Sequence, residues 1–152
     1  MEIRLATQAD LAQLADISKA AGSAAHWTHQ QWLDIFRTQI PSRLVWIAEE
    51  RNAAKNPHPC GFLAAQVSPE WELENIAVLP EFRRRGLARE LLSVLLTHAR
   101  QQGAERILLE VRQSNAPAIQ LYEEAGFQQL GKRPDYYRNP AEDALILVHT
   151  LL

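Results

Sequence analysis

Residues 74–96, ENIAVLPEFRRRGLARELLSVLL, carry the strongest structural pattern in this 152-residue chain. The apolar run Ile76–Val78 stops before Pro80, and an arginine run at 83–85 leads to Gly86. The apolar residues that follow lie on one face of a helix, at positions 87, 88, 91, 92, 95, 96 and 99. The pattern predicts a strand, a glycine-containing turn and an amphipathic helix.

A helix that begins at such a turn is suited to binding an anion. Its first backbone N–H groups have no partner inside the helix, and they lie at the positive end of the helix dipole. The natural anion for this position is a phosphate or a pyrophosphate. An ordinary strand–turn–helix with a solvated arginine run fits the spacing equally well. The stretch has neither the Gly-Lys-Ser/Thr of a Walker A loop nor the GxGxxG of dinucleotide-binding folds.

Composition limits the class of protein. The formal net charge of −2 argues against general nucleic-acid binding, which usually needs a basic excess. No stretch approaches the ~20 apolar residues of a membrane span, and the N-terminus lacks the apolar segment of a signal peptide. Cys60 is the only cysteine, so no intrachain disulfide is expected. We therefore expect one soluble, cytoplasmic domain over residues 1–152.

Strands and helices alternate along the chain, which predicts an α/β or α+β fold with a mixed sheet. Thr7 with Asp10, and Thr28 with Gln31, have the spacing of a capping box at a helix start. Helices are expected from Thr7 to about 21, from Thr28 to about 41, from 86 to 102, and from 115 to 126. Strands are expected at 2–5, 44–48, 61–67, 71–78, 106–111, 127–132 and 144–151. Loops are expected at 51–59 and 133–143.

The strand at 71–78 has an irregular pattern. Its apolar side chains stand first at odd positions, Trp71 and Leu73, and then at even positions, Ile76 and Val78. A half-buried strand keeps a period of two, so the shift at 74–75 predicts one extra residue, a β-bulge.

Two motifs resemble the GCN5-related N-acetyltransferase (GNAT) superfamily. Residues 83–88, RRRGLA, fit R/Q-x-x-G-x-G/A, which is similar to the loop that holds the pyrophosphate of acetyl-CoA in that family. Residues 108–127, LLEVRQSNAPAIQLYEEAGF, resemble the second half of the same fold. The resemblance implies a mostly antiparallel sheet of about seven strands with about four helices. It also implies a bulged and splayed central strand, and acetyl-CoA as co-substrate.

The resemblance implies two groups of cofactor-binding residues. Main-chain groups of the bulged strand should pair with the acyl-pantetheine arm, although these residues could equally be plain core strand. The loop and the start of its helix should bind the pyrophosphate, and an asparagine should contact CoA or simply cap its helix. These residues are Ile76, Ala77, Val78, Arg83, Arg84, Arg85, Gly86, Leu87, Ala88, Arg89 and Asn115.

Acetyl transfer to an amine needs a neutral amine, a donor for the oxyanion and stabilisation of the leaving thiolate. Glu110 is the only acid in the apolar run ILLEV, on a strand expected to line the acyl cleft, and the resemblance implies that it is the proton acceptor. The resemblance also assigns Tyr122 as the acid that protonates the sulfur. Each has a structural alternative, a solvent-facing glutamate and a core tyrosine. Direct attack in a ternary complex is expected, since Cys60 has no evident partner base.

Among GNAT families, the chain most resembles the ribosomal-protein-alanine N-acetyltransferases (RimI type). The motifs that carry this likeness are N-I-A-V (75–78), L-E-V-R-x-S-N (109–115), A-I-x-L-Y-E-x-x-G-F (118–127), R-x-D-Y-Y (133–137) and E-D-A-L-I-L (142–147). The N-terminal half matches loosely, mainly through A-x-x-W-T (24–28), and the 51–59 loop is longer than the family needs.

The likeness implies an N-terminal peptide as substrate, lying between residues 22–27 and 133–143. Trp27, Tyr136 and Tyr137 could form the walls of its site, or could pack the two loops together. No metal is expected, because the five histidines lack the spacing of a metal site. No nucleic acid or membrane partner is expected, and the chain should be a monomer or weak homodimer. A small-molecule amine acetyltransferase and a non-catalytic acyl-CoA sensor remain alternatives.

Overall fold

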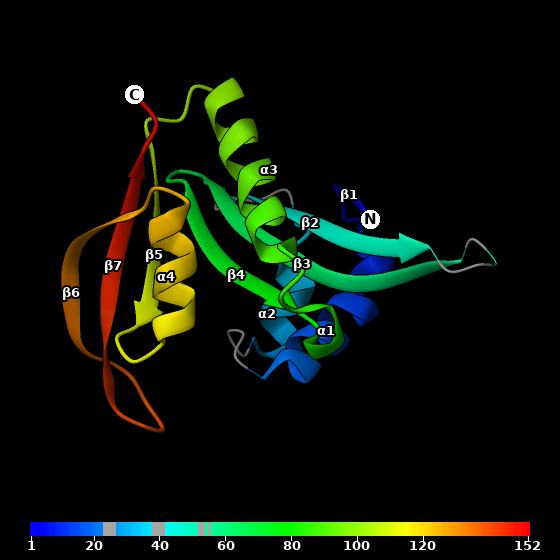
Figure 1. The fold of residues 1–152 in the computed structure, drawn as a ribbon, viewed down its shortest axis with the longest axis horizontal. Helices are drawn as coiled ribbons and strands as arrows, with labels where there is room; N and C mark the ends of the chain where they lie inside the picture. The colour runs from blue at the N-terminus through cyan, green and yellow to red at the C-terminus, as the bar shows by residue number, and fades with distance from the viewer. Residues whose placement is uncertain (23–26, 38–41, 52–53, 55) are drawn as a thin grey trace. The chain divides into compact units, whose positions relative to one another are not determined.

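The computed structural model of the chain describes residues 1–22, 27–37, 42–51, 54 and 56–152. It contains two compact units, Met1–Leu95 and Leu96–Leu152 (Figure 1). The single domain over residues 1–152 stays a prediction. Within the described residues, no helix is both long and apolar enough to cross a membrane.

The first unit is built on four antiparallel strands in the order β1-β2-β3-β4. The strands are β1 (Glu2–Leu5), β2 (Ser42–Arg51), β3 (Pro57–Ser68) and β4 (Glu72–Val78). Its helical elements are η1 (Gln8–Asp10), α1 (Leu11–Ala21), α2 (His29–Asp34), η2 (Pro80–Phe82) and the start of α3 (Leu87–Gln101).

Both predicted capping boxes are present. The Asp10 carboxylate accepts a hydrogen bond of 2.8 Å from the Thr7 backbone N–H. At the start of α2, the Gln31 side chain accepts from the Thr28 N–H at 2.7 Å, and the Thr28 hydroxyl accepts from the Gln31 N–H. These bonds satisfy N–H groups that have no partner inside the helix, so α2 begins where the sequence predicts. Thr7 instead caps the 3-10 helix η1, and α1 itself begins at Leu11.

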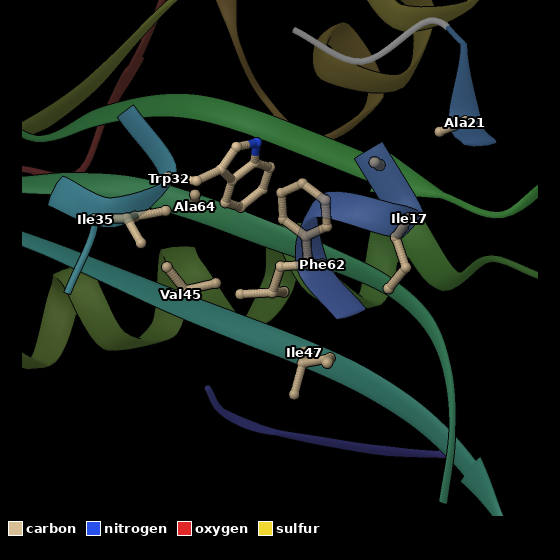
Figure 2. Close-up of a cluster of buried hydrophobic side chains, with 10 residues drawn as sticks. Ile17, Ala21, Trp32, Ile35, Val45, Ile47, Phe62 and Ala64 are labelled. Atoms are coloured by element: carbon tan, nitrogen blue, oxygen red, sulfur yellow. The ribbon is translucent and has the colours of Figure 1, made fainter. Parts of the chain in front are cut away.

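The core of the first unit lies between α1, α2 and one face of β2, β3 and β4 (Figure 2). Trp32 of α2 contacts Phe62 of β3 edge-on, with ring centroids 5.6 Å apart. Val45 and Ile47 of β2, and Ile17 of α1, complete the contact layer around the two rings. Burial of these apolar side chains fixes which face of the strands α1 and α2 cover.

The predicted bulge in β4 is confirmed. Asn75 pairs with Ala64 of β3 and Leu73 pairs with Ala65, so Glu74 is the extra residue between them. Strand side chains alternate between faces, and the extra residue shifts that alternation by one. Leu73 and Ile76 therefore lie on the same face of β4, although one position is odd and the other even.

Two expected boundaries in the first unit are wrong. Strand β3 begins at Pro57, and Pro57 pairs with Arg51, so the ladder takes up both ends of the expected 51–59 loop. Helix α2 ends at Asp34, whereas the expected end near Pro41 lies outside the described residues.

The second unit contains three antiparallel strands in the order β5-β7-β6 and one helix of its own. These elements are β5 (Arg106–Arg112), α4 (Ala116–Glu124), β6 (Gln128–Tyr137) and β7 (Glu142–Thr150). The expected pair of final strands is confirmed, but the expected 133–143 loop is too long. Arg133 pairs with Ala144 and Tyr137 pairs with Glu142, so only residues 138–141 form the turn.

Candidate active site

The predicted anion loop follows β4 directly. Gly86 has a φ of 77°, and its carbonyl accepts the first hydrogen bond of α3, from the Glu90 N–H at 3.0 Å. Arg84 also has a positive φ, of 64°, which is costly for a residue with a side chain. Two left-handed residues close together turn the chain sharply, so the N–H groups at the start of α3 come directly after an exposed loop.

The three loop arginines have different surroundings. Arg83 donates from Nε to the Val78 carbonyl at 3.2 Å and from Nη2 to the Ala21 carbonyl, which joins the loop to the end of α1. Arg85 stacks over the Phe82 ring at 5.2 Å. The side chain of Arg83 is thus committed to the protein, and its backbone N–H donates to the Pro80 carbonyl at 3.3 Å, so a pyrophosphate contact of Arg83 stays a prediction.

The strand segment Ile76–Val78 packs tightly against β3 at one glycine. A Cβ atom at Gly61 would lie 2.7 Å from the Ala77 carbonyl oxygen. Ala77 itself is buried in the core beneath α1 and α2, whereas Ile76 and Val78 are half-buried on the opposite face. The backbone that should meet the acyl-pantetheine arm is therefore held by two contacts, the Ala77 side chain in the core and the pairing with β3.

Glu110 lies in the middle of β5, opposite Ile146 of β7. Its side chain is 19% exposed and forms an ion pair with Arg133 of β6, with 3.4 Å between Oε1 and Nη1. The neighbouring strand residues Leu109 and Val111 point the other way and are buried. Glu110 is therefore a partly buried carboxylate with a cationic partner two strands away, on β6.

Tyr122 lies on α4 and is buried, with 7% of its surface exposed. Its ring meets Phe127 edge-on, with centroids 5.9 Å apart. Burial raises the pKa of its phenol to about 12, and Tyr137 adds to the increase. The hydroxyl therefore keeps its proton throughout the neutral range.

Tyr137, at the end of β6, lies near both predicted catalytic residues. Burial raises the pKa of its phenol to about 12, with a further contribution from the negative charge of Glu110. Because Tyr137 also contributes to the raised pKa of Tyr122, the second unit brings Glu110, Tyr122 and Tyr137 into one electrostatic neighbourhood.

Arg112 and Glu142 hold the residues around Tyr137 in place, and no role was predicted for either of them. The Arg112 guanidinium stacks over the Tyr137 ring at 4.4 Å and donates to the carbonyls of Arg138 and Pro140. It also donates to Glu142, whose other oxygen accepts from the Ser114 N–H. The available signal was position: Arg112 stands within the motif L-E-V-R-x-S-N.

Asn115 is the N-cap of α4, as one of its two readings predicts. Its side-chain oxygen accepts from the Ala118 N–H at 3.3 Å. A contact with CoA stays a prediction.

The three expected substrate-wall residues are divided between the two units. Trp27 is half-buried and packs on Trp32 of α2, with ring centroids 5.0 Å apart. Tyr136 is 46% exposed and lies between Arg133, at 5.2 Å, and Tyr137, at 5.0 Å. Residues 23–26 of the expected peptide site lie outside the described residues. Among the described residues, no group of three or more His, Cys, Asp or Glu could hold a metal ion.

Known proteins share this fold. The crystal structure of the ribosomal-protein-S18-alanine N-acetyltransferase from Escherichia coli superposes with a TM-score of 0.82 and 30% identity, covering 99% of this chain and 93% of that one. Arabidopsis thaliana NAA60 in complex with acetyl-CoA superposes with a TM-score of 0.84 at 17% identity, covering 98% of both chains. The similarity to NAA60 shows the fold alone.

The [ribosomal protein bS18]-alanine N-acetyltransferase of Salmonella typhimurium is 47% identical over 83 residues, which cover 53% of this chain and 56% of that protein. The chain thus spans about half the length of the curated relatives that it matches.

The fold expectation is confirmed. The described residues contain seven strands and four α-helices, and the superpositions extend across nearly the whole chain. The splaying of the central strands stays a prediction. The Acetyltransferase (GNAT) family matches residues 11–127, which is well over half of the sequence. This chain belongs to the acetyltransferase (GNAT) family.

Proposed function

We propose that this protein is an acetyl-CoA-dependent N-acetyltransferase whose acceptor is a protein N-terminal α-amine. The proposed acceptor is the N-terminal alanine of a small-subunit ribosomal protein. The observation that carries the proposal is the similarity to the S18-alanine enzyme of Escherichia coli, at 30% identity over 99% of this chain. The local match to the Salmonella typhimurium enzyme supports the same acceptor.

All the proposed cofactor contacts except that of Asn115 belong to the first unit. The backbone N–H groups from Gly86 to Arg89 bind the pyrophosphate, since the start of α3 offers donors and a positive dipole end. Main-chain groups of Ile76, Ala77 and Val78 hold the pantetheine arm. The side chains of Arg84 and Arg85 add positive charge, which favours an anionic cofactor in this exposed loop.

The proposed base is Glu110. An α-amine has an ordinary pKa of about 8, against about 10.4 for lysine, so it loses its proton more readily near neutral pH. As the nitrogen forms its bond to the carbonyl carbon, the proton that it loses passes to Glu110, directly or through a water. The ion pair with Arg133 of β6 orients the Glu110 carboxylate.

Tyr122 acts on the leaving group. The bond from the carbonyl carbon to sulfur breaks, and the sulfur leaves with the electron pair as a thiolate. A phenol whose pKa is about 12 is a weaker acid than an ordinary thiol, whose pKa is about 8.5. Tyr122 therefore stabilises the thiolate mainly as a hydrogen-bond donor, and transfer of its proton is uphill. This refines the acid role that the sequence predicts.

The peptide contacts are assigned to Tyr136, Tyr137 and Trp27. Tyr136 is exposed and Tyr137 lies near Glu110, which supports a place for these two beside the incoming amine. The proposed setting is the cytoplasm, where ribosomal proteins occur, with the chain acting as a monomer or weak homodimer. No metal and no nucleic acid take part.

Acetyl transfer to two short peptides tests the proposal. One peptide carries a free N-terminal alanine and no lysine, and the other has a blocked N-terminus and an internal lysine. Transfer to the first alone is expected. Transfer to the lysine peptide would overturn the α-amine assignment.

If neither peptide is acetylated while acetyl-CoA still binds, the acceptor assignment is wrong. A screen of small amines would then separate a metabolite acetyltransferase from an acyl-CoA sensor. No binding of acetyl-CoA would overturn the proposal as a whole.

A further inference from the structure

Glu74, the extra residue of the β4 bulge, binds an arginine of β2, two strands away. Glu74 accepts two hydrogen bonds from Arg43 of β2, at 2.6 Å from Nε and at 3.2 Å from Nη2. Both side chains are mostly buried, with 23% of Arg43 and 19% of Glu74 exposed. A bidentate arginine–carboxylate pair fixes direction as well as distance, because both groups are planar.

This pair crosses β3. Arg43 is opposite Gln66 of β3, and Gln66 is opposite Glu72 of β4. Neighbouring strands are roughly 4.8 Å apart, so the two backbones that the pair joins are separated by about 10 Å. The Arg43–Glu74 pair therefore links the bulge residue of β4 to β2, across β3.

The Arg43–Glu74 pair determines the face of the sheet to which the side chain of the bulge residue points. Arg43 shares its face of β2 with Val45 and Ile47, which pack under α1 and α2. Glu74 must point to that same face to reach Arg43. The strand then returns to regular pairing at Asn75, opposite Ala64. Without the pair, one extra residue could be accommodated at a neighbouring position, which would reverse the faces of the residues between.

The residues that follow the bulge are the ones with a proposed role in binding. The segment Ile76–Val78 begins two residues after Glu74 and pairs with β3. We infer that the Arg43–Glu74 pair positions the β4 backbone for the acyl-pantetheine arm of acetyl-CoA, which makes both residues positioning residues. The inference rests on the proposed function and adds two residues to it, neither of which touches the reacting atoms.

The test compares two ligands in the variants Arg43→Gln and Glu74→Gln. The first ligand is acetyl-CoA. The second is a nucleotide fragment of CoA that keeps the phosphates and lacks the pantetheine arm. Each variant should weaken acetyl-CoA binding by roughly 5- to 20-fold in a titration calorimeter and change fragment binding by less than about twofold. A general loss of stability would weaken both ligands alike.

Two further variants complete the design. The reversed pair Arg43→Glu with Glu74→Arg restores the interaction with opposite polarity, so it should recover a large part of the affinity that either single change loses. Arg51→Gln is the matched control, because Arg51 forms an exposed ion pair with Glu2 in the same unit, at 3.7 Å. This control should leave both affinities unchanged.

The outcomes separate the inference from the proposed function. If wild-type protein does not bind acetyl-CoA, the proposed function is wrong and the inference falls with it. If wild-type protein binds but Arg43→Gln and Glu74→Gln bind equally well, the inference alone is wrong. Equal weakening of acetyl-CoA and the fragment would also overturn it, since the pair would then act through overall stability.

Discussion

Gly61 of β3 lies so close to Ala77 of β4 that a Cβ atom would stand 2.7 Å from the Ala77 carbonyl oxygen. That distance is too short for any real contact, and the neighbour is backbone, which cannot rotate away. Glycine is thus required at this position by the close approach of two strands rather than by an unusual φ.

Gly61→Ala should push the β4 backbone away from β3 at the proposed pantetheine contact. We expect acetyl-CoA affinity to fall by about tenfold or more, with a loss of stability of about 1–3 kcal/mol from overpacking. Gly131→Ala is the matched control, because it is also a strand glycine and has nothing within 4 Å of its Cβ position. Titration calorimetry and thermal unfolding measure both effects. Equal effects of the two substitutions would show that the close approach does not matter.

Gly86→Val tests the anion loop. Gly86 has a φ of 77° and nothing within 4 Å of its Cβ position, so a valine strains the backbone without a clash. Acetyl-CoA should bind about tenfold more weakly or worse. Gly103→Val has the same φ and the same open surroundings after the other end of α3, so it should cost similar stability and leave binding intact. Weak binding in both variants would point to general destabilisation.

Tyr122→Phe removes only the phenol oxygen. Phenylalanine keeps the edge-on contact with Phe127, so the fold should remain intact. We expect kcat to fall by about 10²-fold or more with little change in acetyl-CoA affinity, because the hydroxyl acts on the leaving thiolate. Steady-state kinetics with a peptide acceptor measure kcat. An unchanged kcat would remove Tyr122 from the mechanism.

Glu110→Gln removes the proposed base and its ion pair together. Activity should fall by about 10²-fold or more near neutral pH and recover in part at high pH, where the amine is already neutral. Arg133→Gln breaks the same ion pair but keeps the carboxylate, so it should reduce activity much less. The pH profile of kcat/KM distinguishes the two variants. Full activity of Glu110→Gln across that range would assign the base to another group.

Asp10→Asn tests the ion pairs beneath α1. The Asp10 carboxylate accepts two hydrogen bonds from Arg4, which holds its pKa below the usual value of 3.8. A depressed pKa stabilises the folded state above the unfolded value, and this contribution disappears as pH falls through the folded pKa. We expect the variant to lose about 1–3 kcal/mol at neutral pH. The difference in the free energy of unfolding between the variant and wild type should become smaller below about pH 4, near the pKa of aspartate in the unfolded chain.

Chemical denaturation at several pH values measures this stability gap. Asp34→Asn is the control, because its ion pair with Arg37 is exposed and should contribute little. A gap between Asp10→Asn and wild type that does not change with pH would show that the charge of Asp10 is not what stabilises the fold.

Local patterns predicted most of the fold. The period of β4 located the bulge at Glu74, and the spacing of Thr28 and Gln31 located the start of α2. These features depend on neighbours in the sequence. The extension of β6 to Tyr137 was missed because its side chains are almost all exposed, so no apolar alternation indicates a strand. The strand conformation of this extension comes from its pairing with β7.

The motifs proposed the residues of the candidate site, but they indicated few of the contacts that these residues make. Motifs named Glu110 and Tyr122, but the ion pair from Glu110 to Arg133 joins residues on different strands and has no local signal. The same holds for Arg43 and Glu74, which are 31 positions apart. The role of Arg83 was also hidden, because its partners are backbone carbonyls and carry no side-chain pattern.

The anchoring of the β6–β7 turn by Arg112 has an evolutionary consequence. Within the turn, at Arg138 and Pro140, Arg112 binds main-chain oxygens, which every amino acid supplies. Side chains in the turn can therefore change without loss of these two bonds, while Tyr137 stays stacked on the guanidinium. A lineage could thus alter the proposed peptide-facing surface one substitution at a time and keep the geometry around Glu110 intact.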